Sequence, residues 1–427
     1  MNIQVEKGKV LLVSGPASVI TSEGKMTLFG ANLPLGNKVV VRKKRTLPFE
    51  AEENAVLDVT LGGEAQIEEV TGSTIPNCWN KAVKEILSSI GLSTTIILGD
   101  IDCGKTSFCT FLANKALNTG VRTAIIDGDL GQSDVGSPTT VGMSLVSKPI
   151  TDLFTLEPHT LFFAGLTSPS GVTERLITGI RALKVMASEM GIGVIIINTD
   201  GWVKGDEAKN YKTALVKETH PEAVVGIQRN DEVENILSYA EKEGFNVFRI
   251  ASPLCIKKRN SEERKELREQ GYRKFLEGAT LRSLPMGWVE MEYTPLGTGM
   301  PLVADRLKDV ETVLGHKPLY CEENSEELFI VSKENDKIHQ EDIMKVVETF
   351  KKRLYIVKDG DEKGLIVGLL DKNKQFLGLG TIEKIDFENR VLRIYTPYKD
   401  KIGIIQFGQI KIDEKGKEEG IVKSFST

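Results

Sequence analysis

The sequence has little cysteine, and its cysteines follow no recognisable pattern. The five cysteines of this 427-residue chain form no C-x-x-C pair. An odd, scattered set is typical of a reducing compartment and argues against a disulfide framework or a structural zinc site. No apolar run is long enough to span a bilayer, and residues 1–7 lack the basic-then-apolar layout of a signal peptide. We therefore expect a cytoplasmic protein with no membrane partner.

The chain also lacks an excess of positive charge. It contains 55 lysines and arginines and 60 aspartates and glutamates, for a formal net charge of −5. Affinity for nucleic-acid phosphates depends on the local density of cations, so any nucleic-acid site must be a local patch. A hydrophobic content of 40% is ordinary for a soluble globular protein, and the length predicts two or three domains.

The first part of the chain, residues 1 to about 76, is expected to be β-structure. Short β-rich runs separated by turn signals occur at 9–13, 26–29 and 38–41. This spacing predicts a small β-sandwich. A helix is expected next, from Trp79 to Ile90, because apolar residues recur there at helical intervals.

Between residue 94 and about residue 253 the pattern changes to strands that alternate with helices. The expected strands are Thr95–Leu98, Thr123–Ile126, Thr160–Ala164, Gly193–Asn198, Ala223–Ile227 and Asn246–Ile250. This alternation predicts an α/β domain with a parallel sheet covered on both faces. Ligands in such sheets collect at the carboxyl ends of the strands, so the loops that follow the strands are the first candidates for a site.

The remainder of the chain is expected to contain one charged helix and then mostly β-structure. The helix follows Pro253 and runs to about Glu277, and the β-rich tail begins at Leu328. The acidic segment 321–327 is the best candidate for a linker between domains.

The most informative motif is G-x-x-x-x-G-K-[ST], which lies between a strand-like run and a helix-like run. It comprises Gly99, Asp100, Ile101, Asp102, Cys103, Gly104, Lys105 and Thr106, with Ser107 opening the helix. The glycines let successive N–H groups turn inward around phosphate oxygens at the positive end of a helix. Lys105 can then reach the terminal phosphates, and the Thr106 hydroxyl can ligate magnesium. The motif predicts that the chain binds a nucleoside triphosphate with Mg²⁺.

Two carboxylates, Asp127 and Asp129, follow the second expected strand. One of them can hold magnesium through water, and the other can accept a proton from an attacking hydroxyl. We assign magnesium to Asp127 and treat both as catalytic candidates, with the identity of the general base left open. The alternative is that one of them is a solvated turn residue.

Two further groups of residues suit a polynucleotide substrate. Trp202 and Lys204 follow the fourth expected strand, where an indole face can stack on a base and an ammonium can meet the adjacent phosphate. The alternative for Trp202 is a buried aromatic beneath the loop. The charged helix carries an arginine ladder, Arg259, Arg264, Arg268 and Arg273. This ladder fits a lid over a transferring phosphoryl group, and a solvated helix surface is the alternative.

Taken together, four segments resemble the polynucleotide 5′-hydroxyl kinase family. They are the P-loop with Asp102 before its second glycine, D-x-G-Q at Asp129–Gln132, N-T-x-G-W-V-K-G at Asn198–Gly205, and the arginine ladder. That family includes the ATP-binding subunit of the eukaryotic pre-mRNA cleavage factor and the nucleolar kinase of ribosomal RNA processing. Residues 8–17, and residues 73–76 with Trp79, are similar to the family's N-terminal β-domain and its junction.

The resemblance implies a reaction and residue roles. Lys105 and Thr106 would hold ATP and magnesium, Asp129 would activate the 5′-hydroxyl of RNA, with DNA as an alternative acceptor, and Trp202 would stack on the terminal base. Arg259, Arg264 and Arg268 would form the lid, and we add Gln132 and Thr167 as substrate-binding residues. Where eukaryotic members carry an acidic residue that reads adenine, this chain has Lys25–Gly30. The choice of triphosphate is therefore open.

The resemblance also implies three domains. We expect an N-terminal β-domain at 1–76, a P-loop kinase domain with its lid helix at 77–284, and a mostly-β C-terminal domain at 285–427. Two other functions remain as alternatives, a regulatory GTPase and a scaffold that binds ATP without turnover. The GTPase lacks support because no Asn-Lys-x-Asp follows the fourth or fifth expected strand. The sequence assigns no protein partner, oligomeric state or biological substrate.

Overall fold

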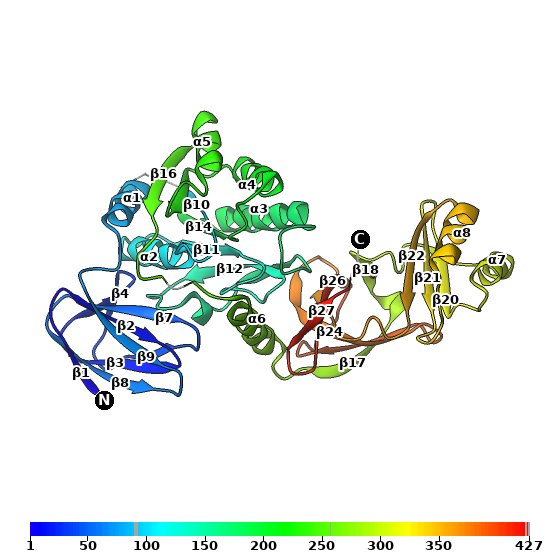
Figure 1. Ribbon diagram of the computed structural model, residues 1–427, viewed down its shortest axis with the longest axis horizontal. Coiled ribbons are helices and arrows are strands. Elements are labelled where there is room, and N and C mark those ends of the chain that lie inside the picture. The colour runs from blue at the N-terminus through cyan, green and yellow to red at the C-terminus, as the bar shows by residue number, and fades with distance from the viewer. Residues whose placement is uncertain (89–92, 257, 423–424, 426–427) are drawn as a thin grey trace. The chain divides into compact units, whose positions relative to one another are not determined.

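The computed structural model describes residues 1–88, 93–256, 258–422 and 425. These residues form two compact units (Figure 1). The first contains Met1–Phe162 and Ser168–Arg268, and the second contains Phe163–Thr167 and Glu269–Thr427.

The chain begins with two antiparallel sheets. One has the order β1-β8-β3-β6 and the other the order β5-β4-β7-β2-β9. Their bounds are β1 Asn2–Val5, β2 Lys9–Ser14, β3 Ala17–Glu23, β4 Met26–Leu28, β5 Ala31–Leu33, β6 Lys38–Val41, β7 Thr46–Ala51, β8 Ala55–Leu61 and β9 Gln66–Thr71. Both sheets contribute to one buried cluster that includes Val13, Leu28, Phe49 and Leu57. The predicted small β-sandwich is confirmed.

A seven-stranded sheet with the order β13-β12-β11-β14-β10-β15-β16 forms the centre of the first unit. Its strands are β10 Ser93–Gly99, β11 Thr123–Gly128, β12 Thr140–Val146, β13 Thr160–Phe163, β14 Val194–Thr199, β15 Ala223–Gln228 and β16 Asn246–Ala251. Strands β11, β14, β10, β15 and β16 are parallel, as expected. The sheet is nevertheless mixed, because β12, which we did not predict, pairs antiparallel with β11. The short segment between these strands contains no helix to carry the chain back, so β12 returns beside β11 in the opposite direction.

Helices cover both faces of this sheet (Figure 1). They are α1 Asn77–Ser88, α2 Lys105–Asn118, α3 Thr173–Glu189, α4 Asp206–Thr219 and α5 Glu234–Lys242. Helices α1 and α2 pack in one apolar cluster, and on the opposite face α4 contacts both α3 and α5. The helix predicted at Trp79–Ile90 is confirmed as α1, and Ile90 lies outside the described residues.

The charged helix is α6, Ser261–Leu276, and the second unit that follows is mostly β. One sheet contains β17 Thr280–Pro285, β18 Glu290–Glu292, β23 Leu365–Leu370, β24 Phe376–Asp386, β25 Val391–Thr396, β26 Ile404–Ile412 and β27 Glu418–Ile421. A second sheet contains β19 Met300–Pro301, β20 Tyr320–Glu323, β21 Glu327–Ser332 and β22 Arg353–Lys358, with helices α7 Ala304–Leu314 and α8 Gln340–Phe350. The predicted mostly-β character is confirmed, and the three-domain division at 76 and 284 stays a proposal.

The predicted linker at 321–327 is wrong. Cys321 and Glu322 belong to β20, which pairs with β21, and both side chains are buried. The acidic residues are satisfied inside the fold: Glu322 accepts hydrogen bonds from the Gly297 N–H and the Tyr320 hydroxyl, and Glu323 pairs with Arg306 and Lys352. The run of acidic residues predicted an exposed linker, but Glu322 and Glu323 have hydrogen-bond and ion-pair partners within the fold. Several of these partners come from distant segments, so the sequence run alone did not reveal them.

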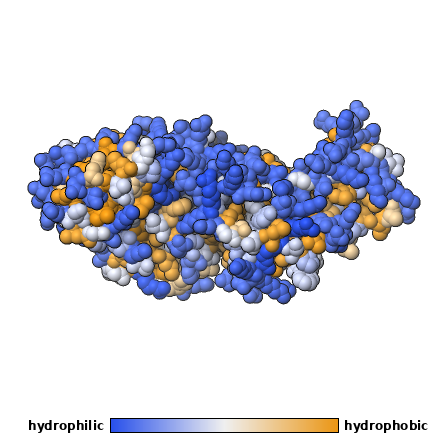
Figure 2. Space-filling view, turned by 90° about the horizontal axis from the view of Figure 1, so that it is seen from below, coloured by the Kyte–Doolittle hydropathy of each residue, from blue (hydrophilic) through white to orange (hydrophobic). Residues whose placement is uncertain are grey.

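Hydrophilic side chains cover most of the face seen in Figure 2, and the hydrophobic ones lie in separate patches. Among the described residues, no helix combines the length and the apolar character needed to cross a bilayer.

Candidate active site

The P-loop connects β10 to α2 at the carboxyl edge of the central sheet. The backbone at Asp102 and Gly104 is left-handed, with φ of 53° and 107°, which lets the loop close back on itself before α2 begins at Lys105. At Gly99 a Cβ atom would lie 2.4 Å from Cys103 Sγ and 2.6 Å from the Ile227 carbonyl oxygen. Position 99 therefore requires glycine because the Cys103 side chain and the backbone of the neighbouring strand β15 leave no room for a side chain.

Lys105 is folded onto the loop. Its ammonium donates hydrogen bonds to the carbonyl oxygens of Gly99 (3.0 Å) and Asp100 (2.8 Å), and its side chain is buried. Thr106 and Ser107 follow it as half-buried residues in the first turn of α2. A phosphate group bound at this helix N-terminus would compete with the two carbonyl oxygens for the ammonium.

The remaining P-loop residues differ in exposure. Ile101 is exposed and Cys103 is buried. Asp100 forms an ion pair of 2.9 Å with Lys204. Burial opposes ionisation of Asp100, but the hydrogen bonds from Lys204 and the Ile101 N–H, together with the positive charges of Lys204 and Lys105, hold the pKa of Asp100 below its ordinary value. The structure thus places Lys204 at the P-loop, and its predicted contact with a substrate phosphate stays a prediction.

Asp127, at the end of β11, is fully buried and surrounded by donors of its own chain. Its Oδ2 accepts from the N–H groups of Asp134 (2.7 Å) and Val135 (3.2 Å), and its Oδ1 accepts from Asn198 Nδ2 (2.9 Å). Burial raises its pKa above the ordinary value. In this arrangement Asp127 holds the loop that follows β11, which we call the acid loop and define as residues 129–135.

Asp129 lies at the start of the acid loop. Its Oδ1 accepts hydrogen bonds from the N–H groups of Gly131 (3.2 Å) and Gln132 (2.9 Å). Burial raises the pKa of Asp129 to about 6, and the negative charges of Asp200 and Asp127 contribute to the rise. A carboxylate whose pKa lies this close to neutrality is well suited to accept a proton from an alcohol during a reaction.

Asp200 was not among the predicted site residues, although it follows β14, the strand that lies beside the P-loop strand β10. Its carboxylate forms a buried ion pair of 2.8 Å with Lys212 and accepts hydrogen bonds from the Tyr211 hydroxyl and the Trp202 N–H. The signal available in the sequence was an acidic residue three positions after the apolar run 194–197, directly after the end of β14.

Trp202 is half-buried at this edge. Its ring stacks on that of Tyr211, with a centroid separation of 6.0 Å and an interplanar angle of 23°. One indole face is therefore supported from below by an aromatic ring.

The arginine ladder separates into two parts. Arg259 and Arg264 both contact the P-loop carboxylate of Asp102, each with a guanidinium nitrogen at 3.4 Å, and the Arg259 N–H donates to the same carboxylate at 2.9 Å. Arg264 is further held by Gln132, whose Nε2 donates to the Arg264 carbonyl oxygen. Arg273, by contrast, contacts Glu269 and the Lys415 carbonyl oxygen within the second unit.

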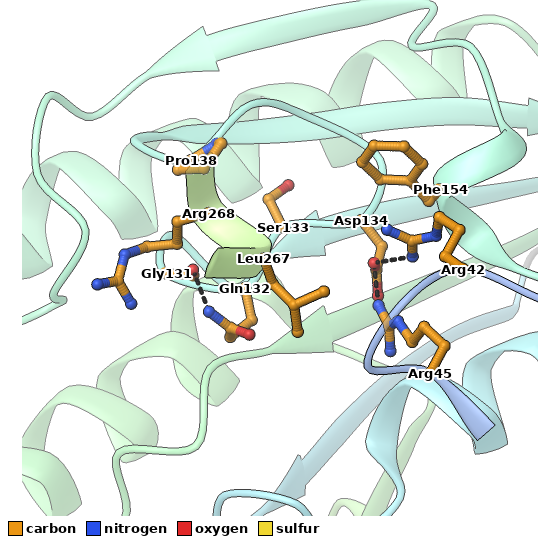
Figure 3. Close-up of a pocket in the computed structure, with 10 residues that line it drawn as sticks. All are labelled: Arg42, Arg45, Gly131, Gln132, Ser133, Asp134, Pro138, Phe154, Leu267 and Arg268. Atoms are coloured by element: carbon orange, nitrogen blue, oxygen red, sulfur yellow. Dashed lines mark hydrogen bonds and ion pairs between the residues drawn. The ribbon is translucent and has the colours of Figure 1, made fainter. Parts of the chain in front are cut away.

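A small pocket lies beside the acid loop (Figure 3). It is lined by Arg42, Arg45, Gly131, Gln132, Ser133, Asp134, Pro138, Phe154, Leu267 and Arg268. The buried Oε1 of Gln132 accepts no hydrogen bond from the described part of the chain, so it is available to a ligand. Arg268 lines the pocket with its side chain directed away from Asp134 (Figure 3). The other candidate, Thr167, belongs to the second unit and is not placed with these residues.

Known proteins provide an independent comparison with this geometry. Residues 99–278 match the family model described as the mRNA cleavage and polyadenylation factor CLP1 P-loop. A polyribonucleotide 5′-hydroxyl-kinase of Methanocaldococcus jannaschii is 30% identical over 334 residues, which cover 77% of this chain and 89% of that protein. A polyribonucleotide 5′-hydroxyl-kinase of Thermococcus kodakarensis is 27% identical over 353 residues, which cover 82% of this chain and 96% of the relative.

Among solved structures, Clp1p in its wild-type complex with Pcf11p (454–563) aligns with a TM-score of 0.66. The alignment covers 96% of this chain and 97% of that one at 13% identity, which is a similarity of fold.

The mixed α/β sheet and the loop at Gly99–Thr106 define a P-loop nucleotide-binding protein. The chain belongs to the CLP1 P-loop family, which includes the archaeal polyribonucleotide 5′-hydroxyl-kinases. The resemblance inferred from the sequence motifs is confirmed.

Proposed function

We propose that this protein is an ATP-dependent polyribonucleotide 5′-hydroxyl kinase. It transfers the γ-phosphoryl group of ATP to the 5′-hydroxyl of RNA, so that a P–O bond to ADP breaks, a P–O bond to the RNA forms, and the hydroxyl proton leaves. The proposal is carried by two observations at one P-loop. The lid arginines Arg259 and Arg264 contact the P-loop carboxylate of Asp102, and the half-buried carboxylate of Asp129 interacts electrostatically with Lys105 of the same loop. Phosphoryl transfer requires positioned charges of this kind and little covalent participation by the protein.

Each part of the site has a role in this proposal. Lys105 leaves the loop carbonyls to hold the terminal phosphates, and Asp129 accepts the hydroxyl proton. Arg264 and Arg268 neutralise the charge on the transferring group, while Arg259 and Gln132 contact the substrate. Trp202 stacks on the terminal base, and Lys204 and Thr167 contact the RNA backbone.

Magnesium fits the donor set of this edge. The Thr106 hydroxyl and the carboxylates of Asp129 and Asp200 are hard oxygen ligands of the type that Mg²⁺ prefers. Like-charge repulsion from Asp200 and Asp127 helps to raise the pKa of Asp129, and a divalent cation relieves such repulsion. A bound Mg²⁺ would supply positive charge that offsets the charge of the phosphate groups. Chain donors already fill the oxygens of both Asp127 and Asp200, so we propose the Thr106 hydroxyl as the holding group of this chain and retain Asp127 as the residue that orders the acid loop.

One assay tests the proposed function directly. Labelled ATP is incubated with 5′-hydroxyl RNA and, separately, with DNA of the same sequence, and end-labelled product is separated on a gel. We expect labelled RNA, and the DNA reaction measures acceptor preference. If the protein bound ATP but gave no labelled product, the kinase proposal would be wrong and the protein would be an ATP-binding scaffold. Because all five cysteines are free, we place this reaction in the cytoplasm.

The stacking role of Trp202 predicts a specific kinetic defect. Trp202→Ala should raise the KM for RNA about 10-fold and leave the KM for ATP nearly unchanged, because base stacking contributes about 1–3 kcal/mol. Trp202→Phe should recover much of the loss, since a ring can still stack on Tyr211. Steady-state kinetics and thermal unfolding check this result. A large fall in Tm with an unchanged KM for RNA would instead identify Trp202 as a packing residue.

The lid predicts a defect in turnover. The double change Arg264→Ala/Arg268→Ala should lower the single-turnover rate by roughly 100-fold at saturating ATP and RNA, because these cations stabilise charge that develops on the phosphoryl group. Lys265→Ala is the matched control, since Lys265 carries the same charge on the same helix but is exposed. Equal and mild effects of the arginine and lysine changes would show that the ladder is solvated helix surface.

A further inference from the structure

Four consecutive basic residues, Arg42–Arg45, connect β6 to β7 in the N-terminal β-domain. Such a run commonly marks a nucleic-acid-binding patch. Here, however, each of the four side chains is paired with a carboxylate of its own chain. The two arginines are largely buried, with side chains 15% and 14% exposed, whereas Lys43 and Lys44 are 38% and 27% exposed. We call Arg42–Arg45 the basic segment.

The two arginines of the basic segment converge on the acid loop (Figure 3). Arg45 forms an ion pair with Asp134, and Arg42 pairs with the same carboxylate at 3.1 Å. Arg42 also makes two hydrogen bonds to Asp152, at 2.7 and 3.0 Å, and its guanidinium lies 3.8 Å from the centre of the Phe154 ring. A bidentate contact of this kind fixes the orientation of the Arg42 guanidinium as well as its distance from Asp152.

Asp134 connects these arginines to the proposed catalytic carboxylate. The Asp134 N–H donates to Asp127 Oδ2 at 2.7 Å, and the Asp129 N–H lies 3.3 Å from Asp127 Oδ1. The side chain of Asp129 in turn accepts from the N–H groups of Gly131 and Gln132. The acid loop is therefore held at both ends, internally by Asp127 and from the β-domain through Asp134.

The two lysines of the basic segment contact the lid helix. Lys43 pairs with Glu266 at 3.0 Å and Lys44 with Glu263 at 3.7 Å. Both glutamates lie in the first two turns of α6, on either side of Arg264 in the sequence. These partly exposed ion pairs are individually weak, so the buried arginines must make the larger contribution.

We propose that the basic segment is a positioning element by which the N-terminal β-domain fixes the acid loop and, more weakly, the start of the lid helix. Arg45 is the main positioning residue, because its largely buried guanidinium forms an ion pair with Asp134. The inference rests on the proposed function in one respect only: it takes the acid loop to carry the catalytic carboxylate. Displacement of that carboxylate by about 1 Å costs on the order of 100-fold in rate.

The kinetic test compares Arg45→Gln with Arg249→Gln. Arg249 is a matched control in the same unit, because it makes two ion pairs, with Glu234 and Glu241, on the far side of the sheet from the acid loop. We expect Arg45→Gln to lower kcat by ~10- to 100-fold with the KM values for ATP and RNA within about 2-fold of wild type, and Arg249→Gln to leave kcat unchanged. A folded Arg45→Gln protein with wild-type kcat would overturn the proposal, even if its Tm were lower.

Arg45→Lys covers the case in which Arg45→Gln does not fold, since it keeps the charge opposite Asp134 but loses the planar guanidinium. A kcat reduced by ~3- to 10-fold supports the proposal, and an unchanged kcat contradicts it. In a double-mutant cycle, Arg45→Gln and Asp134→Asn should be non-additive, because both changes break the Arg45–Asp134 ion pair; Asp134→Asn also breaks the pair with Arg42.

Hydrogen exchange supplies a readout that does not depend on activity. The N–H groups of Asp134 and Val135 are bonded to Asp127, so wild-type protein should protect peptides that cover 129–135. Arg45→Gln should lose this protection and Arg249→Gln should keep it. Unchanged protection in Arg45→Gln would refute the positioning role, whatever the assay shows. A wild-type protein that exchanges as expected but labels no RNA would refute the kinase proposal and leave the positioning of the loop intact.

Discussion

A Lys105→Ala protein should bind nucleotide weakly and transfer essentially no phosphate from ATP to RNA. Lys105 is the residue of the P-loop that can bring a positive charge to the terminal phosphates, and charge neutralisation is the main contribution that a protein makes to this reaction. We expect the end-labelling rate to fall by at least ~1,000-fold. Gel detection of labelled RNA at saturating ATP measures the loss.

The structure determines how the control for this prediction is designed. The Lys105 side chain is buried, and its ammonium satisfies the carbonyl oxygens of Gly99 and Asp100. Truncation to alanine therefore leaves two carbonyl groups without their donor and costs some stability. Lys105→Met keeps the packing of the stem while removing the charge, so its rate should be as low as that of Lys105→Ala with a Tm closer to wild type. Near-normal labelling by either folded variant would exclude ATP bound at this loop as the donor.

Elements of the fold that depend on residues close together in the chain could be predicted from the sequence. The P-loop was recognisable because its glycines, Lys105 and Thr106 occupy fixed positions between a strand and a helix. Of the five parallel strands, β10, β11, β14 and β15 were recognisable because each contains at least three consecutive apolar residues, whereas the apolar residues of β16 are interrupted by Arg249. Strand β12 was missed because Thr140–Val146 has no such run, and its place in the sheet depends on pairing with β11.

The parts of the site that depend on distant contacts could not be read from the sequence. The pairing of Asp102 with Arg259 and Arg264 joins segments more than 150 residues apart. The same limit applies to Arg45 and Asp134, because nothing in the basic run indicates which carboxylates it meets. Asp127 and Asp129 are separated by a single residue, yet the fold surrounds one with backbone donors and leaves the other at the start of the acid loop. Sequence reasoning can identify such a pair, but it cannot decide which member is the base.

The choice of general base between Asp127 and Asp129 can be tested with Asp129→Asn, for which we expect a large fall in kcat. Asparagine keeps an oxygen that can accept from the Gly131 and Gln132 N–H groups, so the acid loop should retain its shape. The change removes the negative charge that accepts the hydroxyl proton, and kcat should fall by roughly 100-fold or more while ATP binding largely survives. Single-turnover labelling and direct nucleotide binding separate these two quantities.

Asp127→Asn should behave differently, because both oxygens of Asp127 accept hydrogen bonds from the chain. An amide there must direct its NH₂ group at a neighbouring N–H donor, which costs about 1–3 kcal/mol for a buried polar group left unpaired. We therefore expect a clear fall in Tm from Asp127→Asn and little change in Tm from Asp129→Asn. If Asp127→Asn instead kept its Tm and lost more turnover at saturating magnesium, Asp127 would be the general base. In that case the raised pKa of Asp129 would reflect only its burial among like charges, since burial alone can raise the pKa of a carboxyl group that takes no part in the reaction.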